Sequence, residues 1–230
     1  KDALINDGTL KVIGSEIDKE YLAEVKKVTV DPELVAEEGK TMKLIFTPLH
    51  GTGAMLGEKA LRQAGFEDFT MVPEQATPDA DFSTVEHPNP EFPEAFDLAI
   101  KLGKRDDADL LIAVDPDADR LGAAVRQPDG DYKLLTGNQI AAIMLNYILT
   151  ARKNAGTLPE NGALVKSIVS SEFAAKVAKD FGCDTINVLT GFKFIAEQIQ
   201  HFEETNEHTF MMGFEESYGY LSGTYVRDKD

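Results

Sequence analysis

The chain passes twice through the same order of short apolar segments and amphipathic segments, and this repetition constrains its fold more than any other feature. Each round predicts a buried strand, a helix and a second strand. The segments are 43–47, 54–64 and 66–72 in the first round, and 163–169, 172–181 and 185–189 in the second. A strand–helix–strand unit places its two strands parallel to each other. The sequence therefore predicts an α/β fold of two similar domains, each with a mixed, mostly parallel sheet flanked by helices.

The joint that follows the first helix of each round contains the same residue. Gly65 stands in Ala-Gly-Phe-Glu and Gly182 in Phe-Gly-Cys-Asp, and glycine commonly ends a helix because it tolerates a left-handed backbone. Further predicted helices span 16–28, 93–102, 138–150 and 192–202, and further predicted strands span 110–114, 121–126, 132–135 and 209–213. We divide the chain into 1–42, the end of a preceding domain and a linker, and two α/β domains, 43–135 and 136–230.

Composition excludes several classes of function. A formal net charge of −17 argues against nucleic acid and anionic membranes as partners. The single cysteine, Cys183, excludes an internal disulfide framework and a multi-cysteine zinc site. Residues 1–10 lack the apolar core of a signal peptide, and no apolar run is long enough to span a membrane. We expect a cytoplasmic protein, and the lack of an initiator Met together with the charged residues 227–230 is compatible with an excised fragment.

The loop after the strand 110–114 carries three aspartates at alternate positions, Asp115, Asp117 and Asp119. Ligands of open α/β sheets bind beyond the carboxyl ends of the strands, and carboxylate oxygens select hard cations such as Mg²⁺ or Ca²⁺. An EF-hand is disfavoured because arginines stand where its glycine and bidentate glutamate belong. A solvated acidic turn is the alternative. The adjacent Arg120 is either a counter-ion for the aspartates or a phosphate-binding group.

The string Asp-Pro-Asp-Ala-Asp-Arg-Leu-Gly at 115–122 resembles the metal loop of the α-D-phosphohexomutases, the phosphoglucomutase and phosphomannomutase superfamily. Four further segments are similar to motifs of that family in the same order: 47–53, 190–193, 213–219 and 227–230. The resemblance covers the chain from about residue 43 to its end. The amino-acid sequences of these loops are most similar to those of the phosphoglucomutase and phosphopentomutase branch.

The resemblance implies roles for the matching residues. The three aspartates would bind one Mg²⁺ together with a phosphoserine oxygen, and Arg120 would lie beside that phosphate. Adjacent sugar hydroxyls would be bound by Glu215 and Ser217, and Lys229 would be the general acid or base. The substrate side of the cleft would be lined by Thr190, Gly191 and Lys193. The role of His50 in the glycine-containing loop 47–53 stays open, because a position in the cleft and one outside it are equally compatible with the sequence.

Two motifs of the family are missing from the chain. Neither a Thr-Ala-Ser-His-Asn-Pro loop, which carries the family's active serine, nor a Ser-Gly-Thr-Glu phosphate clamp occurs. The resemblance therefore implies domains two and three of a four-domain enzyme, whose domains one and four would be partners of this chain. The implied activity moves a phosphoryl group between C1 and C6 of a hexose phosphate, glucose 1-phosphate and glucose 6-phosphate, with a hexose 1,6-bisphosphate as activator. The alternatives are a phosphomannomutase or phosphopentomutase or, for the isolated chain, a non-catalytic module that binds metal or sugar phosphate. We expect the chain alone to be inactive.

Overall fold

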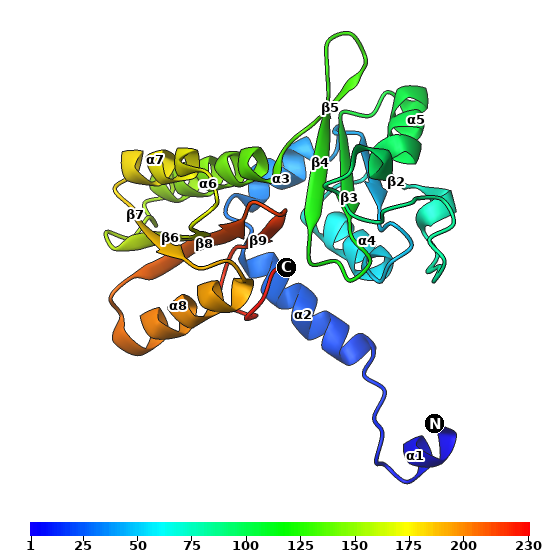
Figure 1. Cartoon of the computed structure of the whole chain (residues 1–230), viewed down its shortest axis with the longest axis horizontal. Helices are drawn as coiled ribbons and strands as arrows, with labels where there is room; N and C mark the ends of the chain where they lie inside the picture. The colour runs from blue at the N-terminus through cyan, green and yellow to red at the C-terminus, as the bar shows by residue number, and fades with distance from the viewer.

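Two separate β-sheets, each flanked by helices, form the body of the protein in the computed structural model, which describes residues 1–230 (Figure 1). In spatial order, the first sheet contains β2 (Phe69–Met71), β1 (Leu44–Thr47), β3 (Leu110–Val114), β4 (Leu121–Arg126) and β5 (Tyr132–Leu134). The second contains β7 (Asp184–Val188), β6 (Gly162–Ser167), β8 (Thr209–Glu215) and β9 (Gly219–Leu221). This arrangement confirms the predicted pair of similar α/β domains.

The strands of the two sheets pair in the same way. In the first sheet β1 pairs in parallel with β2 and β3, and β4 returns antiparallel beside β3, followed by β5. In the second sheet β6 pairs in parallel with β7 and β8, and β9 returns antiparallel beside β8. The loop that follows β3 therefore emerges next to the loop that follows β1, and the loop that follows β8 emerges next to the loop that follows β6. Functional loops of an α/β sheet gather at such carboxyl ends.

Helices cover both faces of each sheet. The chain contains α1 (Asp2–Asn6), α2 (Ser15–Lys27), α3 (Pro32–Glu38), α4 (Gly53–Ala64), α5 (Asp97–Asp106), α6 (Gly137–Asn154), α7 (Glu172–Asp180) and α8 (Phe192–Thr205), with 3-10 helices at Pro73–Gln75 and Pro93–Phe96. Of these, α1 is exposed and lies away from both sheets (Figure 1). In the first domain α4 lies on one face, where a Cβ at Gly57 would come within 2.7 Å of the Phe46 ring. On the other face, Ala99 of α5 belongs to the same buried cluster as Ile45 and Leu111. Alternation of side chains along the strands thus supplies both faces with apolar groups.

The second domain has the same layered plan. Leu164 of β6 belongs to the cluster shared with α6 and α7, whereas its neighbours Ala163 and Val165 belong to the cluster that contains Ile195 of α8. Thr136 begins α6 with a capping box. Its hydroxyl oxygen accepts a hydrogen bond from the Gln139 amide, and the Gln139 side-chain oxygen accepts one from the Thr136 amide. Packing on both faces buries every residue of β6.

The element bounds differ from the sequence expectation at a few places. The helix 16–28 ends as predicted before Pro32, but Pro32 then begins the unpredicted helix α3, since Asp31 accepts a hydrogen bond from the Leu34 amide and proline fits the first helical turn. The short helix α1 and the strand β9 were also not predicted. Both predicted glycine joints are confirmed, with φ of +104° at Gly65 and +76° at Gly182.

The two domains are in direct contact through backbone and side chains. The Leu121 amide donates a hydrogen bond to the Tyr218 carbonyl at 3.0 Å, and the Tyr218 hydroxyl donates to the Leu135 carbonyl at 3.2 Å. Leu121 and Leu135 also pack against the main cluster of the second domain. The strand that leaves the aspartate loop is therefore attached to the loop that follows β8. The division into 1–42, 43–135 and 136–230 stays a prediction.

None of the helices has the length and apolar character that crossing a membrane requires. The cytoplasmic location stays a prediction.

Candidate active site at the domain junction

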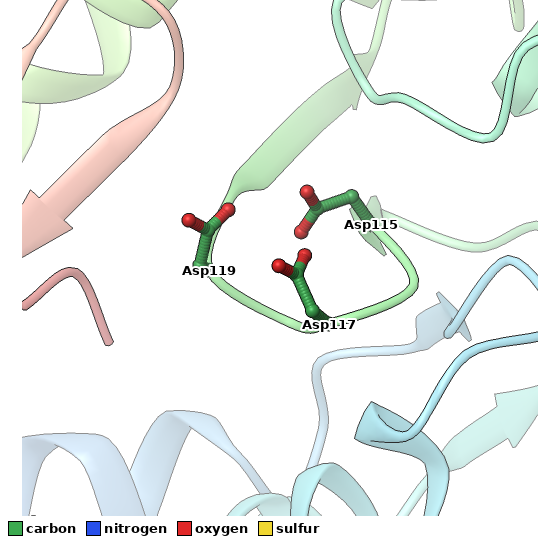
Figure 2. A group of neighbouring side chains, drawn as sticks. All are labelled: Asp115, Asp117 and Asp119. Carbon is green, nitrogen blue, oxygen red and sulfur yellow. The ribbon is translucent and has the colours of Figure 1, made fainter.

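The aspartate loop joins β3 to β4 and gathers its three carboxylates. One oxygen from each of Asp115, Asp117 and Asp119 lies within 4.8 Å of the others, and Asp115 and Asp117 face each other across the loop with Asp119 on its opposite arm (Figure 2). Ala118 has a φ of +62°, which turns the chain between Asp117 and Asp119. The Arg120 amide donates to Asp115 Oδ1 at 2.9 Å and closes the loop. The sequence prediction of a carboxylate cluster therefore corresponds to a real convergence of side chains.

The electrostatics of the loop favour a bound cation. Burial raises the pKa of Asp115 to about 7, and the Asp119 and Asp117 carboxylates act in the same direction against the lowering effect of the Arg120 amide. A carboxylate that is 8% exposed beside two others is costly to ionise unless a positive charge compensates it. Three carboxylate oxygens on one loop are the hard donors that Mg²⁺ prefers, so the residues present fit this ion.

Arg120 makes its direct ion pair with a residue that the sequence analysis did not single out. Its Nη1 hydrogen-bonds to Glu91, while its Nε lies 3.8 Å from oxygens of both Asp115 and Asp119. The guanidinium therefore borders the carboxylate cluster and is held from the other side by Glu91. This position is compatible with both roles considered for Arg120, since the group remains partly exposed.

Lys229 lies beside the carboxylate cluster, although it is next to the last residue of the chain. Its Nζ is 2.8 Å from Asp119 Oδ2, and its side chain is only 15% exposed. A Cβ at Gly219 would come within 2.2 Å of Lys229 Cδ, so a larger residue there would displace the lysine from its present path. The Asp230 amide donates to the Tyr220 carbonyl at 3.0 Å and fixes the tail along β9. The tail of the second domain thus reaches the aspartate loop of the first.

Asp230 also attaches the tail to α2. Its carboxylate accepts hydrogen bonds from the hydroxyls of Tyr21 at 2.7 and 2.8 Å and of Tyr225. Burial and these hydrogen bonds raise the pKa of both tyrosines well above the ordinary value, so they remain donors. Residues 1–42 consequently contribute a side chain to the support of Lys229, which sequence patterns did not indicate.

Glu215 and Gly191, two predicted substrate residues, are in contact. Glu215 is 7% exposed at the end of β8, and its Oε1 accepts a hydrogen bond from the Gly191 amide at 2.7 Å. Gly191 has a φ of +114° as it leads into α8, a conformation that favours glycine. Ser217 is half-buried beside Tyr218, whose φ is +67°. The loop that the resemblance assigned to the sugar and the loop that it assigned to the substrate side of the cleft are therefore in contact.

Thr190 and Lys193 lie at the exposed margin of these two loops. The Lys193 Nζ lies over the Phe194 ring, 4.9 Å from its centroid, and forms no ion pair. It is therefore not brought into contact with Glu215 or Ser217.

A buried polar cluster behind Glu215 was not anticipated. Glu216 Oε2 accepts hydrogen bonds from the Ser167 and Ser170 hydroxyls at 2.8 and 3.0 Å. Beside them Lys166 is fully buried, with its Nζ 3.0 Å from the Ser170 carbonyl and 2.9 Å from Glu172 Oε1. One feature of the sequence could have indicated this cluster. Lys166 stands inside the apolar run 163–169, and a buried charge needs polar partners.

A cavity of about 530 Å³ opens beside the carboxylate cluster. Its polar end is formed by Asp117, Asp119, Arg120 and Lys229, and its body is lined by apolar residues of β1, β3 and α4. This volume lies in the range of about 300–1,000 Å³ that is typical of small-molecule sites.

Two family models match the chain. "Phosphoglucomutase/phosphomannomutase, alpha/beta/alpha domain II" matches residues 19–130, and the corresponding domain III model matches residues 136–230. Two tandem α/β domains with an acidic loop at their junction thus define the class as that of the phosphohexomutases. The chain belongs to the phosphoglucomutase/phosphomannomutase family and contains its domains II and III.

Curated relatives and solved structures agree with this family. A phosphoglucomutase of Staphylococcus epidermidis is 44% identical over 189 residues, which are 82% of this chain and 34% of the relative. The chain therefore spans about a third of the length of the curated relatives it matches. A putative phosphomannomutase of Thermus thermophilus has the same fold, with a TM-score of 0.68 at 21% identity over 91% of this chain and 44% of that one.

A second similar structure was solved with ligands. It is the N-acetylphosphoglucosamine mutase of Aspergillus fumigatus, in complex with GlcNAc-6P and magnesium, with a TM-score of 0.60 at 16% identity over 90% of this chain and 40% of that one. A serine-to-alanine variant of the same enzyme was solved with glucose 1,6-bisphosphate.

Proposed function

We propose that this chain is the central part of a Mg²⁺-dependent phosphoglucomutase, which moves a phosphoryl group between C1 and C6 of glucose phosphate. The observation that carries the proposal is the 2.8 Å contact between Lys229 and Asp119, because it brings a candidate proton-transfer group of one domain to the carboxylate cluster of the other. The 42–44% identity to phosphoglucomutases favours glucose as the sugar. Mannose and pentose phosphates are the alternative substrates.

In this proposal Asp115, Asp117 and Asp119 hold one Mg²⁺, which supplies positive charge next to the phosphoryl group being transferred. Arg120 provides a planar pair of donors that matches phosphate oxygens. The phosphoryl carrier is a phosphoserine outside this chain, and a hexose 1,6-bisphosphate restores it. The complexes of the Aspergillus fumigatus mutase with magnesium and with glucose 1,6-bisphosphate support the Mg²⁺ and the hexose 1,6-bisphosphate of this proposal, through similarity of fold alone.

The sugar is bound by the surface that Glu215 and Ser217 form with Gly191. A sugar hydroxyl needs both an acceptor and a donor, and a carboxylate next to a hydroxyl offers both. Recognition of a diol suits a mutase, because the sugar must bind in two orientations. Thr190 and Lys193 border this surface. Lys229 donates a proton to the sugar oxygen that loses the phosphoryl group, or removes one from the oxygen that gains it.

An activity assay of the full-length protein tests the proposal. We expect interconversion of glucose 1-phosphate and glucose 6-phosphate that depends on Mg²⁺, with slower turnover of mannose and ribose phosphates. The 230-residue chain alone should show no turnover, because positioning of the phosphoryl donor supplies most of the rate of such reactions and the chain lacks the serine loop. Measurable turnover by the isolated chain would refute the assignment of the carrier to another part of the protein.

Substitution of Glu215 tests the sugar site. Glu215→Ala in the full-length protein removes a charged acceptor, and hydrogen bonds to charged groups contribute about 1.5–3 kcal/mol. We therefore expect kcat/KM to fall about 10- to 150-fold in both directions of the reaction. Because Glu215 also accepts from the Gly191 amide, the melting temperature should fall as well.

A matched control separates binding from folding in this experiment. Glu197→Ala removes an exposed carboxylate from α8 of the same domain and should leave kcat/KM unchanged. Normal kcat/KM in folded Glu215→Ala protein with a lowered melting temperature would mean that this loop is only a structural turn.

A further inference from the structure

We infer that His50 is a positioning residue for the aspartate loop, to which it is connected through residues 51–53. The inference rests on the proposed metal-dependent function, and it concerns a residue for which the sequence left the role open. His50 is 5% exposed, and it is not among the residues that line the cavity beside the carboxylate cluster. It has a φ of +63°, and the preceding Leu49, fully buried, has a φ of +45°. Such consecutive left-handed residues need surrounding contacts to hold them in place.

The His50 ring is held at both of its nitrogens. Nδ1 lies 3.2 Å from the Thr77 carbonyl oxygen, and Nε2 lies 2.8 Å from the Thr84 hydroxyl. A carbonyl oxygen only accepts, so Nδ1 carries the hydrogen, and in the neutral ring Nε2 accepts from the hydroxyl of Thr84. The backbone amide of His50 donates to the Gln75 carbonyl at 3.0 Å. Ring and backbone are thus attached to the segment 75–84.

The same hydrogen-bond chain returns to the loop through buried groups. The Gln75 side-chain amide donates to Thr84 Oγ1 at 3.1 Å, and its Oε1 accepts from the Thr47 hydroxyl at 2.6 Å. Thr47 Oγ1 in turn accepts from the Leu49 amide at 3.1 Å. Gln75, Thr47 and Leu49 are almost completely buried, so water does not replace the bonds that Thr47 makes to Gln75 and Leu49. Thr84 lies at the surface, but the Thr47–Gln75 part of the network is buried, and a buried, satisfied hydrogen-bond network specifies one arrangement of the loop.

The loop that His50 fixes is in close contact with the metal loop. The amide and hydroxyl of Thr52 both donate to the Pro116 carbonyl, at 2.8 and 3.1 Å. A Cβ at Gly51 would come within 2.2 Å of the Pro116 Cα, and one at Gly53 would come within 3.2 Å of the Ala118 Cβ. Pro116 stands between two of the candidate ligands. Any displacement of residues 51–53 therefore moves the backbone that carries the carboxylates.

Metal affinity depends on the residues that hold the metal ligands in place, and this dependence sets the effect that we expect from substituting His50. Removal of groups that orient metal ligands typically lowers metal affinity by about 10- to 100-fold. His50 acts through one further layer of contacts, so we expect the lower end of this range. His50→Ala should weaken Mg²⁺ affinity about tenfold, measured by isothermal titration calorimetry with Mg²⁺ alone at a temperature where the variant is folded.

Two further variants distinguish positioning from general stability. His50→Asn keeps a residue that tolerates a left-handed backbone and a short amide donor toward Thr77, so Mg²⁺ affinity should be largely retained. Glu86→Gln changes an exposed side chain just beyond the same segment that takes no part in the network, and its Mg²⁺ affinity should be unchanged. If His50→Ala lowers the melting temperature but binds Mg²⁺ as the unaltered chain does, the inference is overturned.

A second measurement does not depend on metal or on the folding of His50→Ala. Thr84→Val changes a surface residue and removes only its hydroxyl from the network. In metal-free protein, hydrogen exchange of the Thr52 and Arg120 amides should become faster in this variant, while exchange in β6 stays the same. Unchanged exchange at both amides would overturn the inference. If the unaltered full-length protein binds no Mg²⁺, the proposed metal function fails, and the exchange experiment still decides whether His50 positions the loop.

Discussion

Asp117→Ala is expected to weaken Mg²⁺ affinity by at least about 100-fold, because loss of an outer support alone costs roughly 10- to 100-fold and Asp117 is itself a candidate ligand. The three candidate carboxylates lie within 4.8 Å of one another, and Mg²⁺ demands near-octahedral oxygen coordination. Asp117 is exposed, so its removal should not disrupt packing. Isothermal titration calorimetry of the full-length protein with Mg²⁺ measures the effect, and turnover should fall with the affinity.

A charge-matched control is available in the same domain. Asp68→Ala removes an exposed carboxylate just before β2 and changes the net charge by the same amount. Its Mg²⁺ affinity should equal that of the unaltered protein, which excludes a general electrostatic effect. Equal Mg²⁺ affinity in Asp117→Ala and Asp68→Ala would refute the metal site.

Lys229→Met in the full-length protein is expected to lower kcat by about 10²- to 10⁴-fold, the contribution of a positioned general acid or base. Methionine keeps an unbranched apolar side chain that can cross Gly219, so the tail should remain in place. The substitution removes only the ammonium, which lies 2.8 Å from Asp119. Since it also frees Asp119 from its ion pair, Mg²⁺ affinity should not decrease. Steady-state kinetics and calorimetry together measure these two effects.

The alternative role for Lys229 is a structural ion pair. A pair of this kind near the surface contributes only about 0–1 kcal/mol to stability, so it predicts a slightly lower melting temperature with normal kcat. Lys176→Met, an exposed lysine of α7, serves as the control for loss of one positive charge. If Lys229→Met and Lys176→Met have the same kcat, Lys229 does not transfer protons.

The local features of the fold could be read from the sequence because neighbouring residues generate them. Apolar runs such as 43–47 and 110–114 indicate strands, and the glycines 65 and 182 indicate where helices end, through the backbone freedom of that residue. The aspartates 115, 117 and 119 could be recognised as one cluster because they share a single short loop. The order of the elements then sufficed for two similar α/β domains.

Contacts between segments far apart in the chain were decided only by the tertiary structure. Lys229 is next to the last residue of the chain, and it reaches Asp119 only because the tail runs along β9, a three-residue strand that the sequence did not predict. The buried side chain of His50 likewise depends on the return of the segment 75–84 against β1. Periodicity reports which side of an element is buried, but it does not report which segment covers that side. That choice follows from packing and hydrogen bonds that exist only once the whole chain has folded.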